Sequence, residues 1–572
     1  MSLPTWKSNV GYEEGAKWVV DNMVTGYPRF FIHKKIQALA EVITSTFARS
    51  PGQQAMLFPT KAIALRCVEF LKSIAPAEVL EGLDTVHLVL NTSDPEAAPL
   101  KPINPTISAV LFQPEAFSYA KQYWQHTGDG ISSRRGEFCH SLFSQGLLIP
   151  DDSSRRSPKS SLRHTHRGPR RYQRAIPTDE TAHGLDPYSD ESIRFVEERF
   201  GRNLDISLAE RAKTAIRRRI AGTLTHHVDI NSNPLPAVEP SSRGVTESDI
   251  YLFPNGINAI YNTHRLLLSV RGSMESLSFG FPYVDTLKIL QKFGPGCVFY
   301  GRASEAELDE LERRLESGER FLGLFCEFPG NPMLTCPNLG RIRRLADRYD
   351  FALVVDETIG TFGNIDVLRY ADVVVSSLSK IFSGDCNVMG GSAVLSPASR
   401  YYAPLKAAAA ATAAQLEDTY WPEDAIFMER NSRDFASRID RINVNAEAIA
   451  ELLLTHPLVK RVHYPKCNDD RDNYEDCKLP TGGYGGLLSV VFKRKEDAVV
   501  FYDSIESAKG PSLGTNFTLT SPYVVLAHYL ELDWAASLGV DPNLLRISVG
   551  LEDTQRLVGV FMRALGAAEE AS

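Results

Sequence analysis

Short apolar runs that alternate with longer amphipathic stretches constrain the fold of this chain more than any other feature. Between residues 250 and 375 each run is four or five residues long; the runs are Ile250–Phe253, Cys297–Tyr300, Phe321–Phe325, Phe351–Val355 and Asp372–Val375. Strands at this spacing, with helices between them, form βαβ units. We therefore predict an α/β fold with a mainly parallel central sheet and helices on both faces.

The rest of the chain divides into further parts. Residues 1–150 mix two patterns and predict an N-terminal α/β extension of unknown role, with helices at Gly15–Val24 and Phe31–Phe47 and strands at Thr85–Leu90 and Ala109–Phe112. We expect a large domain at 187–400. A smaller α+β domain at 401–572 is expected to hold helices at Pro404–Leu416 and Glu423–Thr455 and strands at Gly483–Phe492 and Leu545–Val549.

One basic segment departs from this pattern. Residues 154–174 hold eight Arg and Lys residues and no Asp or Glu, whereas the whole chain has a net charge of -8. Such a composition cannot bury a core, so we predict that 151–186 is an exposed Ser/Arg-rich linker. Its only aromatic residue is Tyr172, which gives nucleic-acid bases little to stack on. We therefore expect no nucleic-acid partner.

The cysteines and the hydropathy exclude other classes of protein. The eight cysteines form no Cys-x-x-Cys pair and no metal-ligand spacing, and several lie in apolar runs, which is typical of reduced intracellular proteins. No run approaches the roughly 18 apolar residues of a membrane span. We expect a cytoplasmic protein without a metal and without a membrane partner.

Two charged side chains follow neighbouring predicted strands. Asp356 closes one apolar run and Lys380 follows the next, and side chains beyond the carboxyl ends of parallel strands meet at one edge. A cofactor with a pyridine nitrogen and an aldehyde needs this pair, because the carboxylate keeps the ring protonated and the lysine forms a Schiff base. Taken alone, the pair is equally compatible with a loop-capping aspartate and an unrelated lysine.

A glycine turn before a predicted helix could bind a phosphate group. Gly256 leads from a short strand into the helix Ile257–Ser269, whose first N–H groups and dipole favour an anion. Ser377 and Ser379 flank the lysine turn and could donate to the same phosphate.

Two more residues have alternative interpretations. Tyr283 could stack on a planar ring or could be an ordinary core tyrosine. Arg546 suits a substrate carboxylate, but it could equally form a surface ion pair with Glu552 or Asp553.

Residues 190–566 resemble the Cys/Met-metabolism family of pyridoxal-phosphate enzymes, which have fold type I. The motifs occur in the family's order: PNGINAI, CEFPGNP, VVDETIGT, SSLSKIFSGDCNVMGG, MERNSRDFASRIDRINVNA and LLRISVGLED. Within that family the chain is most similar to the fungal cystathionine gamma-synthases, which also carry an N-terminal region. The segments TGDGISSRRGEF and MVTGYPRFFIH fit that branch.

The resemblance implies pyridoxal 5'-phosphate as cofactor and gives each residue a role. Lys380, Tyr283 and Asp356 are the catalytic residues: Lys380 forms the Schiff base and moves protons, Tyr283 stacks on the ring and Asp356 pairs with its nitrogen. The other implied cofactor contacts are Gly256, Ile257, Asn331, Ser377 and Ser379, and Arg546 with Asn331 binds the substrate carboxylate.

The resemblance also implies a homo-oligomer, a dimer or a tetramer with shared active sites. The family sends a Tyr-x-Arg from the partner subunit to the phosphate, and here Phe200 and Arg202 occupy those places, so Arg202 keeps the contact and Phe200 lacks the hydroxyl. After the lysine, Ile381 and Gly384-Asp385 replace the family's Tyr and Gly-His.

The implied reaction is gamma-replacement on O-acetyl- or O-succinyl-homoserine, an amino-acid substrate, with cysteine to form cystathionine, a step of transsulfuration in methionine and cysteine biosynthesis. One alternative within the fold is replacement with another nucleophile (sulfide, a carbon nucleophile or an amine), and another is a C–S lyase. A remote alternative is an inactive enzyme whose N-terminal region is a binding or regulatory module.

Overall fold

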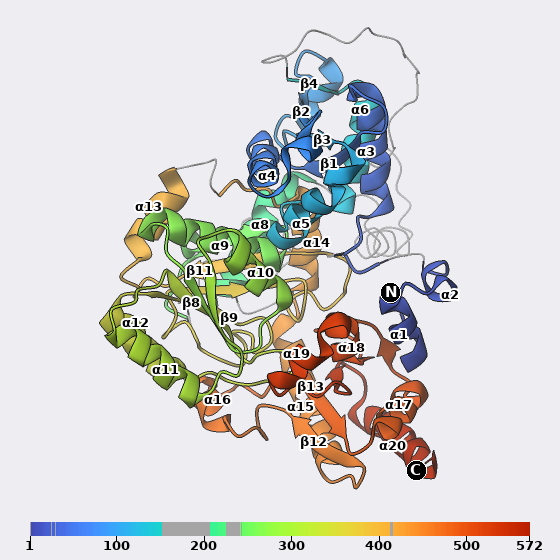
Figure 1. The fold of residues 1–572 in the computed structure, drawn as a ribbon, viewed down its shortest axis with the longest axis vertical. Coiled ribbons are helices and arrows are strands. Elements are labelled where there is room, and N and C mark those ends of the chain that lie inside the picture. The colour runs from blue at the N-terminus through green and yellow to red at the C-terminus, as the bar shows by residue number, and fades with distance from the viewer. Residues whose placement is uncertain are drawn as a thin grey trace, which may run out of the picture.

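The computed structural model describes residues 2–23, 26–28, 30–151, 206–224, 241, 243–411 and 416–571. Their strands form three sheets, one in each of three parts of the molecule. Figure 1 shows the N-terminal extension (blue) at one end, the large sheet with its helices (green) in the middle and the small domain (orange to red) at the other end. The predicted linker after Asp151, together with Phe200 and Arg202, lies outside the described residues.

The central sheet has seven strands and confirms the predicted α/β class. Their order is β5 (Ile250–Phe253), β11 (Gly391–Leu395), β10 (Val373–Ser376), β9 (Ala352–Asp356), β8 (Gly323–Glu327), β6 (Ser276–Phe279) and β7 (Cys297–Tyr300). The strands from β10 to β7 pair in parallel, and β11 pairs antiparallel with both of its neighbours. The five apolar runs predicted as strands all form strands, with bounds shifted by two residues at most.

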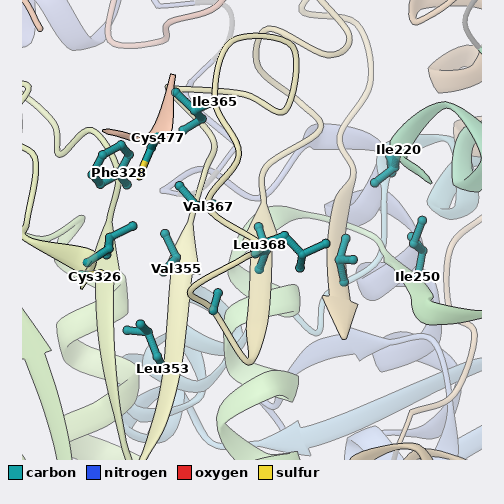
Figure 2. Packing of buried hydrophobic residues seen from close by; sticks show 14 of the residues in the cluster. Ile220, Ile250, Cys326, Phe328, Leu353, Val355, Ile365, Val367, Leu368 and Cys477 are labelled. Atoms are coloured by element: carbon teal, nitrogen blue, oxygen red, sulfur yellow. The ribbon is translucent and has the colours of Figure 1, made fainter. Parts of the chain in front are cut away.

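Helices cover both faces of this sheet, as predicted. One face packs against α8 (Ala209–Ala221), α11 (Glu305–Glu316), α12 (Leu339–Tyr349) and α14 (Pro422–Asn431), and the other against α9 (Gly256–Arg271), α10 (Val284–Lys292) and α13 (Tyr402–Ala411). Figure 2 shows Leu353 and Val355 of β9 with Cys326 of β8 in the first of these cores. Because both faces are covered, most residues of these strands are apolar and buried, which is typical of parallel sheets.

The small domain contains a five-stranded sheet in the order β12 (Val459–His463), β13 (Leu487–Phe492), β16 (Leu545–Ser548), β15 (Leu519–Ser521) and β14 (Ala508–Lys509). Its core includes residues of α15 (Phe435–Leu454), α17 (Lys495–Ser504) and α20 (Thr554–Ala571), and the shorter helices are α16 (Arg471–Cys477), α18 (Tyr523–His528) and α19 (Leu532–Ser537). The helix expected at Glu423–Thr455 is divided between α14 and α15. Although the sequence suggests a boundary at residue 400, α13 and α14 pack against α9 and α8 of the large domain.

The N-terminal extension has an antiparallel sheet in the order β1 (Gln54–Phe58), β3 (Ile107–Phe112), β2 (Asp84–Leu90) and β4 (Leu148–Pro150). One core beside it includes α3 (Lys34–Phe47) and α6 (Ser133–Ser144), and another includes α4 (Lys61–Ile74) and α5 (Phe117–Thr127). The strands predicted at Thr85–Leu90 and Ala109–Phe112 and the helix ending at Phe47 are therefore confirmed.

The first two helices differ from the prediction. The helix expected at Gly15–Val24 is reduced to α2 (Lys17–Val20), and the first turns of the chain form α1 (Trp6–Glu13) instead. Thr5 and Ser8 form a capping box at the start of α1, and Gly15 follows its end with a φ of +67°. Trp6 is buried whereas Trp18 is 53% exposed, so packing favours the earlier segment.

The helix α1 packs on the small domain rather than on the extension that follows it, as Figure 1 shows. Trp6 N donates to Asp503 Oδ1 (2.7 Å), and Tyr529 Oη donates to Glu14 Oε1 (2.6 Å). The side chains of Tyr502 and Lys509 donate to the backbone carbonyls of Leu3 and Pro4, both at 2.7 Å. The chain therefore runs from the small domain to the extension between residues 14 and 33.

The extension contacts the large domain through the segment TGDGISSRRGEF. Asp129, 3% exposed, accepts from Tyr123 Oη of its own domain and from Asn258 Nδ2 of α9, both at 2.7 Å. Asn255 Nδ2, at the start of α9, donates to Gly128 O (2.9 Å). Arg134 donates to Asp424 Oδ1 (2.8 Å) and to Asn387 O (2.7 Å). Buried and mutually satisfied polar groups of this kind fix one docked geometry.

No helix in the described part of the chain is long and apolar enough to cross a membrane.

We predict that Asp129→Ala destabilises the folded protein by about 3 kcal/mol, because it removes the buried acceptor of Tyr123 Oη and one of the two acceptors of Asn258 Nδ2, and it also removes the carboxylate that lies 3.6 Å from Arg66. The measurement is the midpoint of thermal unfolding. The matched control is Glu137→Ala, whose exposed ion pair with Lys35 contributes less than about 1 kcal/mol. Equal midpoints for the two variants would contradict this account of the domain contact.

Candidate active site

The carboxyl edge of the central sheet brings the predicted charged residues together. Glu327 at the end of β8 is in register with Asp356 at the end of β9, and Asp356 is in register with Val375 of β10. Lys380 follows β10 after a turn in which its backbone N–H donates to Ser377 O (3.3 Å). Three neighbouring parallel strands thus supply a carboxyl pair and an amine at one edge, where open α/β sheets bind ligands.

The amine of Lys380 contacts two hydroxyl groups that lie far away in the sequence. Lys380 Nζ donates to Tyr27 Oη (2.8 Å) and to Ser512 Oγ (3.5 Å). Neither residue is among the site residues predicted from the sequence. Tyr27 lies in MVTGYPRFFIH, a segment that was predicted only to mark the fungal branch.

The carboxyl groups at this edge are partly buried. Burial raises the pKa of Asp356, and hydrogen bonds from Thr358 act against this rise; the backbone N–H of Thr358 donates to Asp356 Oδ1 at 2.8 Å. Burial and, secondly, the charge of Asp356 raise the pKa of Glu327 to about 8. A cationic group beside Asp356 would favour its ionised form.

Glu327 also connects two predicted site residues. Its Oε1 accepts from the backbone N–H of Tyr283 (2.5 Å), and its Oε2 accepts from the backbone N–H of Asn331 (3.1 Å). Tyr283 is the N-cap residue of α10. Glu327 thereby fixes the backbone of both residues, and the sequence analysis did not single it out although it lies within the quoted motif CEFPGNP.

The predicted phosphate cradle is assembled where α9 begins. Asn255 caps this helix by accepting from Asn258 N (2.9 Å), so the N–H groups of Gly256 and Ile257 lie in its first turn. A Cβ on Gly256 would come within 2.7 Å of Ser377 Cβ, so only glycine allows the lysine turn to approach. The hydroxyl of Ser379 stabilises the same turn through the backbone N–H (3.0 Å) and carbonyl (3.3 Å) of Gly390.

Arg546 lies on β16 of the small domain and is 2% exposed. Its Nη1 donates to Asn331 Oδ1 (3.1 Å), and its Nη2 donates to the carbonyls of Pro511 (2.6 Å) and Ser512 (3.0 Å). Asn331 Nδ2 donates to Tyr523 Oη (2.8 Å). The alternative ion pair with Glu552 is wrong, because Glu552 accepts from the hydroxyl and N–H of Thr518 instead.

A tyrosine ring packs against the Arg546 guanidinium. The guanidinium lies over the Tyr523 ring, 4.4 Å from its centre. Burial lowers the pKa of Arg546, and the hydroxyls of Tyr523, Tyr27 and Tyr283 act in the opposite direction.

These residues fit pyridoxal phosphate. Gly256, Ile257 and Ser377 form a cradle for an anion, Asp356 lies where a protonated ring nitrogen would be stabilised, and Lys380 supplies the amine. The described residues contain no group of three or more His, Cys, Asp or Glu side chains that could hold a metal ion.

The raised pKa of Glu327 predicts a pH dependence. Because this pKa, about 8, lies above the usual 4.5, the folded protein binds the proton more tightly than the unfolded chain does. The contribution of protonated Glu327 to the free energy of unfolding is therefore fully present below pH 4.5, and it is lost as the pH rises to 8. When the pH is raised from 5 to 9, the midpoint of thermal unfolding of the cofactor-free wild type should fall by several degrees more than that of the Glu327→Gln variant. The exposed control Glu275→Gln should follow the wild type, and parallel curves for wild type and Glu327→Gln would contradict the prediction.

Comparisons with known proteins cover the whole chain. The model of "Fungal trans-sulfuration enzyme, N-terminal domain" matches residues 35–132, and that of "Cys/Met metabolism PLP-dependent enzyme" matches residues 250–566. A crystal structure of cystathionine gamma synthase from Xanthomonas oryzae, 21% identical, has a similar fold with a TM-score of 0.50, over 63% of this chain and 99% of that one.

The matches to curated relatives extend over nearly the full lengths of this chain and of the relatives. A cystathionine gamma-synthase of Neurospora crassa is 59% identical over 100% of this chain and 96% of the relative. A cystathionine gamma-synthase of Saccharomyces cerevisiae is 36% identical (98% and 96%), and an alanine racemase of Aspergillus violaceofuscus is 32% identical (99% and 94%). With these matches and this site, the chain belongs to the Cys/Met metabolism family of pyridoxal-phosphate-dependent enzymes.

Proposed function

We propose that this enzyme is a cystathionine gamma-synthase. It replaces the acyloxy group of O-acetyl- or O-succinyl-homoserine with the sulfur of cysteine, and so takes part in transsulfuration. The observation that carries the proposal is the assembly of Lys380, Asp356 and the Arg546–Asn331 pair in a chain that is 59% identical to a cystathionine gamma-synthase over its whole length.

Lys380 is the residue that moves protons. When bound, pyridoxal phosphate supplies an electron-accepting ring that makes the protons next to an amino group acidic. The amine of Lys380 takes the proton from the substrate Cα and later returns one. Tyr27 and Ser512 orient this amine through the two hydrogen bonds described above.

Asp356 and the cradle hold the cofactor. Asp356, partly buried at the end of β9, would stabilise a protonated ring nitrogen, and Tyr283 would stack on the ring. Gly256, Ile257, Ser377 and Ser379 would hold the phosphate, which is the role that the family resemblance implies for them. Asp356 gives up favourable hydration in this position, and a cationic ring nitrogen compensates for that loss.

Arg546 and Asn331 orient the substrate. Two carbonyls and Asn331 fix the guanidinium, so it is positioned before the substrate carboxylate arrives. Burial strengthens its attraction for an anion because water screens the charges less.

A second candidate function would differ in the nucleophile that enters. Relatives of this chain carry names for different reactions: one that is named alanine racemase is 32% identical over 99% of this chain. After Lys380 the chain has Gly384, with a φ of +74°, and Asp385, whose Oδ1 accepts from Asn516 Nδ2 (2.6 Å). Replacement with sulfide, a carbon nucleophile or an amine, and C–S lysis, are therefore the alternatives that the product assay must separate.

We also propose a homo-oligomer, a dimer or a tetramer, with active sites shared between subunits. The proposal depends on Arg202 and Phe200, which lie outside the described residues. The measurement is light scattering coupled to gel filtration; a monomer that is fully active would contradict it.

The product assay tests the proposed function. Purified enzyme with pyridoxal phosphate receives O-acetyl- or O-succinyl-homoserine together with cysteine and sulfide, and mass spectrometry identifies the products. We expect cystathionine as the main product. Homocysteine as the main product would identify sulfide as the nucleophile, and 2-oxobutyrate formed whatever thiol is present would identify an elimination.

We predict that Asp356→Ala keeps the cofactor bound but lowers kcat by about 100-fold or more, because the ring loses the charge that stabilises its protonated form. Asp347→Ala is the matched control, since its carboxylate lies in an exposed ion-pair cluster away from the edge. Steady-state kinetics and the visible absorbance of the cofactor are the two measurements. A variant that keeps most of its turnover would contradict the role of Asp356.

A further inference from the structure

The N-terminal segment before the extension reaches the catalytic amine. Tyr27 Oη accepts a hydrogen bond from Lys380 Nζ at 2.8 Å, and the amine lies 5.3 Å from the centre of the Tyr27 ring. The two residues are 353 positions apart in the sequence. Neither family-model match includes Tyr27, since one begins at residue 35 and the other at residue 250.

The contact is held from both sides of the segment. Upstream, α1 is tied to the small domain by Trp6, whose N–H donates to Asp503 Oδ1, and by the bond from Tyr502 Oη to the carbonyl of Leu3 just before this helix. Downstream, His33 caps α3, which packs in the extension through α6 and β1. A segment anchored at both ends loses less conformational entropy when its middle part occupies a site.

The local turn presents the tyrosine. The backbone N–H groups of Phe30 and Phe31 both donate to Tyr27 O, at 2.9 and 3.1 Å, and the rings of Tyr27 and Phe30 lie 6.0 Å apart. A Cβ on Gly26 would come within 2.5 Å of Phe31 Cβ, so glycine is needed for this turn to close. The segment thus has a defined shape at Tyr27.

The Tyr27 hydroxyl shares the Lys380 amine with Ser512, which also contacts Arg546, the residue that binds the substrate carboxylate in the proposed function. Ser512, the second acceptor of Lys380, carries the carbonyl that holds Arg546 at 3.0 Å. Tyr27, Ser512 and Arg546 are therefore parts of one hydrogen-bonded surface around the amine.

We propose that Tyr27 is a catalytic residue whose hydroxyl oxygen holds the Lys380 amine in position for proton transfer at the substrate. The proton transfer in this role rests on the proposed function, whereas the contact between Tyr27 and Lys380 does not depend on it. Lys380 Nζ gains the proton that leaves Cα, the Tyr27 oxygen accepts a hydrogen bond from the resulting ammonium, and the phenol stays neutral throughout. The hydrogen bond to a charged donor is stronger than the one to the neutral amine, so it favours the proton transfer.

Tyr27→Phe with the matched control Tyr529→Phe tests this role. Both variants lose one tyrosine hydroxyl from a contact between the N-terminal segment and the remaining chain, but only Tyr27 contacts Lys380. We expect Tyr27→Phe to lower kcat by about 10- to 100-fold, in the lower range of general acid–base effects, with KM for the homoserine ester changed less than about threefold. Tyr529→Phe should keep the wild-type kcat.

A second measurement does not depend on the reaction. Cofactor-free wild type and both variants are treated with an amine-acylating reagent, and mass spectrometry follows the modification of the peptide that contains Lys380. Without the hydrogen bond to Tyr27, the amine should be modified about three- to tenfold faster in Tyr27→Phe, the factor expected for one net hydrogen bond. A lysine outside the site, the exposed Lys460, should be modified at one rate in all three proteins.

The two measurements separate the possible failures. If the enzyme makes a product other than cystathionine but Tyr27→Phe lowers its kcat and speeds the modification of Lys380, the proposed function fails and the role of Tyr27 stands. Unchanged kcat together with an unchanged rate of modification would overturn the role of Tyr27. A higher kcat in Tyr27→Phe would also overturn it and would identify the contact as inhibitory.

Discussion

The site depends on the parallel register of β8, β9 and β10. That register places Glu327 beside Asp356 and leads the chain from Val375 into the turn that carries Lys380. A slip of one residue would turn Asp356 toward the opposite face of the sheet and would remove it from the amine. The apolar cores on both faces fix the register, because each strand buries almost all of its side chains.

The first 150 residues contact the candidate site through two segments. TGDGISSRRGEF contacts the start of α9, whose first turn belongs to the predicted phosphate cradle, through Asp129 and Gly128. In MVTGYPRFFIH, Tyr27 contacts Lys380. Both motifs that mark the fungal branch therefore contact the candidate site or the helix beside it, which is a structural role that their own sequences did not suggest.

Sequence reasoning predicted what local patterns determine and missed what long-range packing determines. Strands such as Ile250–Phe253, and the position of Asp356 and Lys380 at the ends of neighbouring strands, follow from hydrophobic runs and from the geometry of parallel sheets. The contact between Tyr27 and Lys380 joins segments that are 353 residues apart, and the hydrophobic pattern of the sequence gives no sign of it. The prediction of a helix at Gly15–Val24 was wrong for the same reason. The segment that became helical is the one whose Trp6 is buried against the small domain.

The central claim is that Lys380 is the lysine that holds the cofactor. The most direct test is to reduce the enzyme with borohydride in the presence of pyridoxal phosphate, digest it and map the labelled peptide by mass spectrometry. The account predicts that the phosphopyridoxyl group is found on Lys380 and that Lys380→Ala carries no label at any lysine. A label on another lysine of the wild-type enzyme, or none, would contradict it.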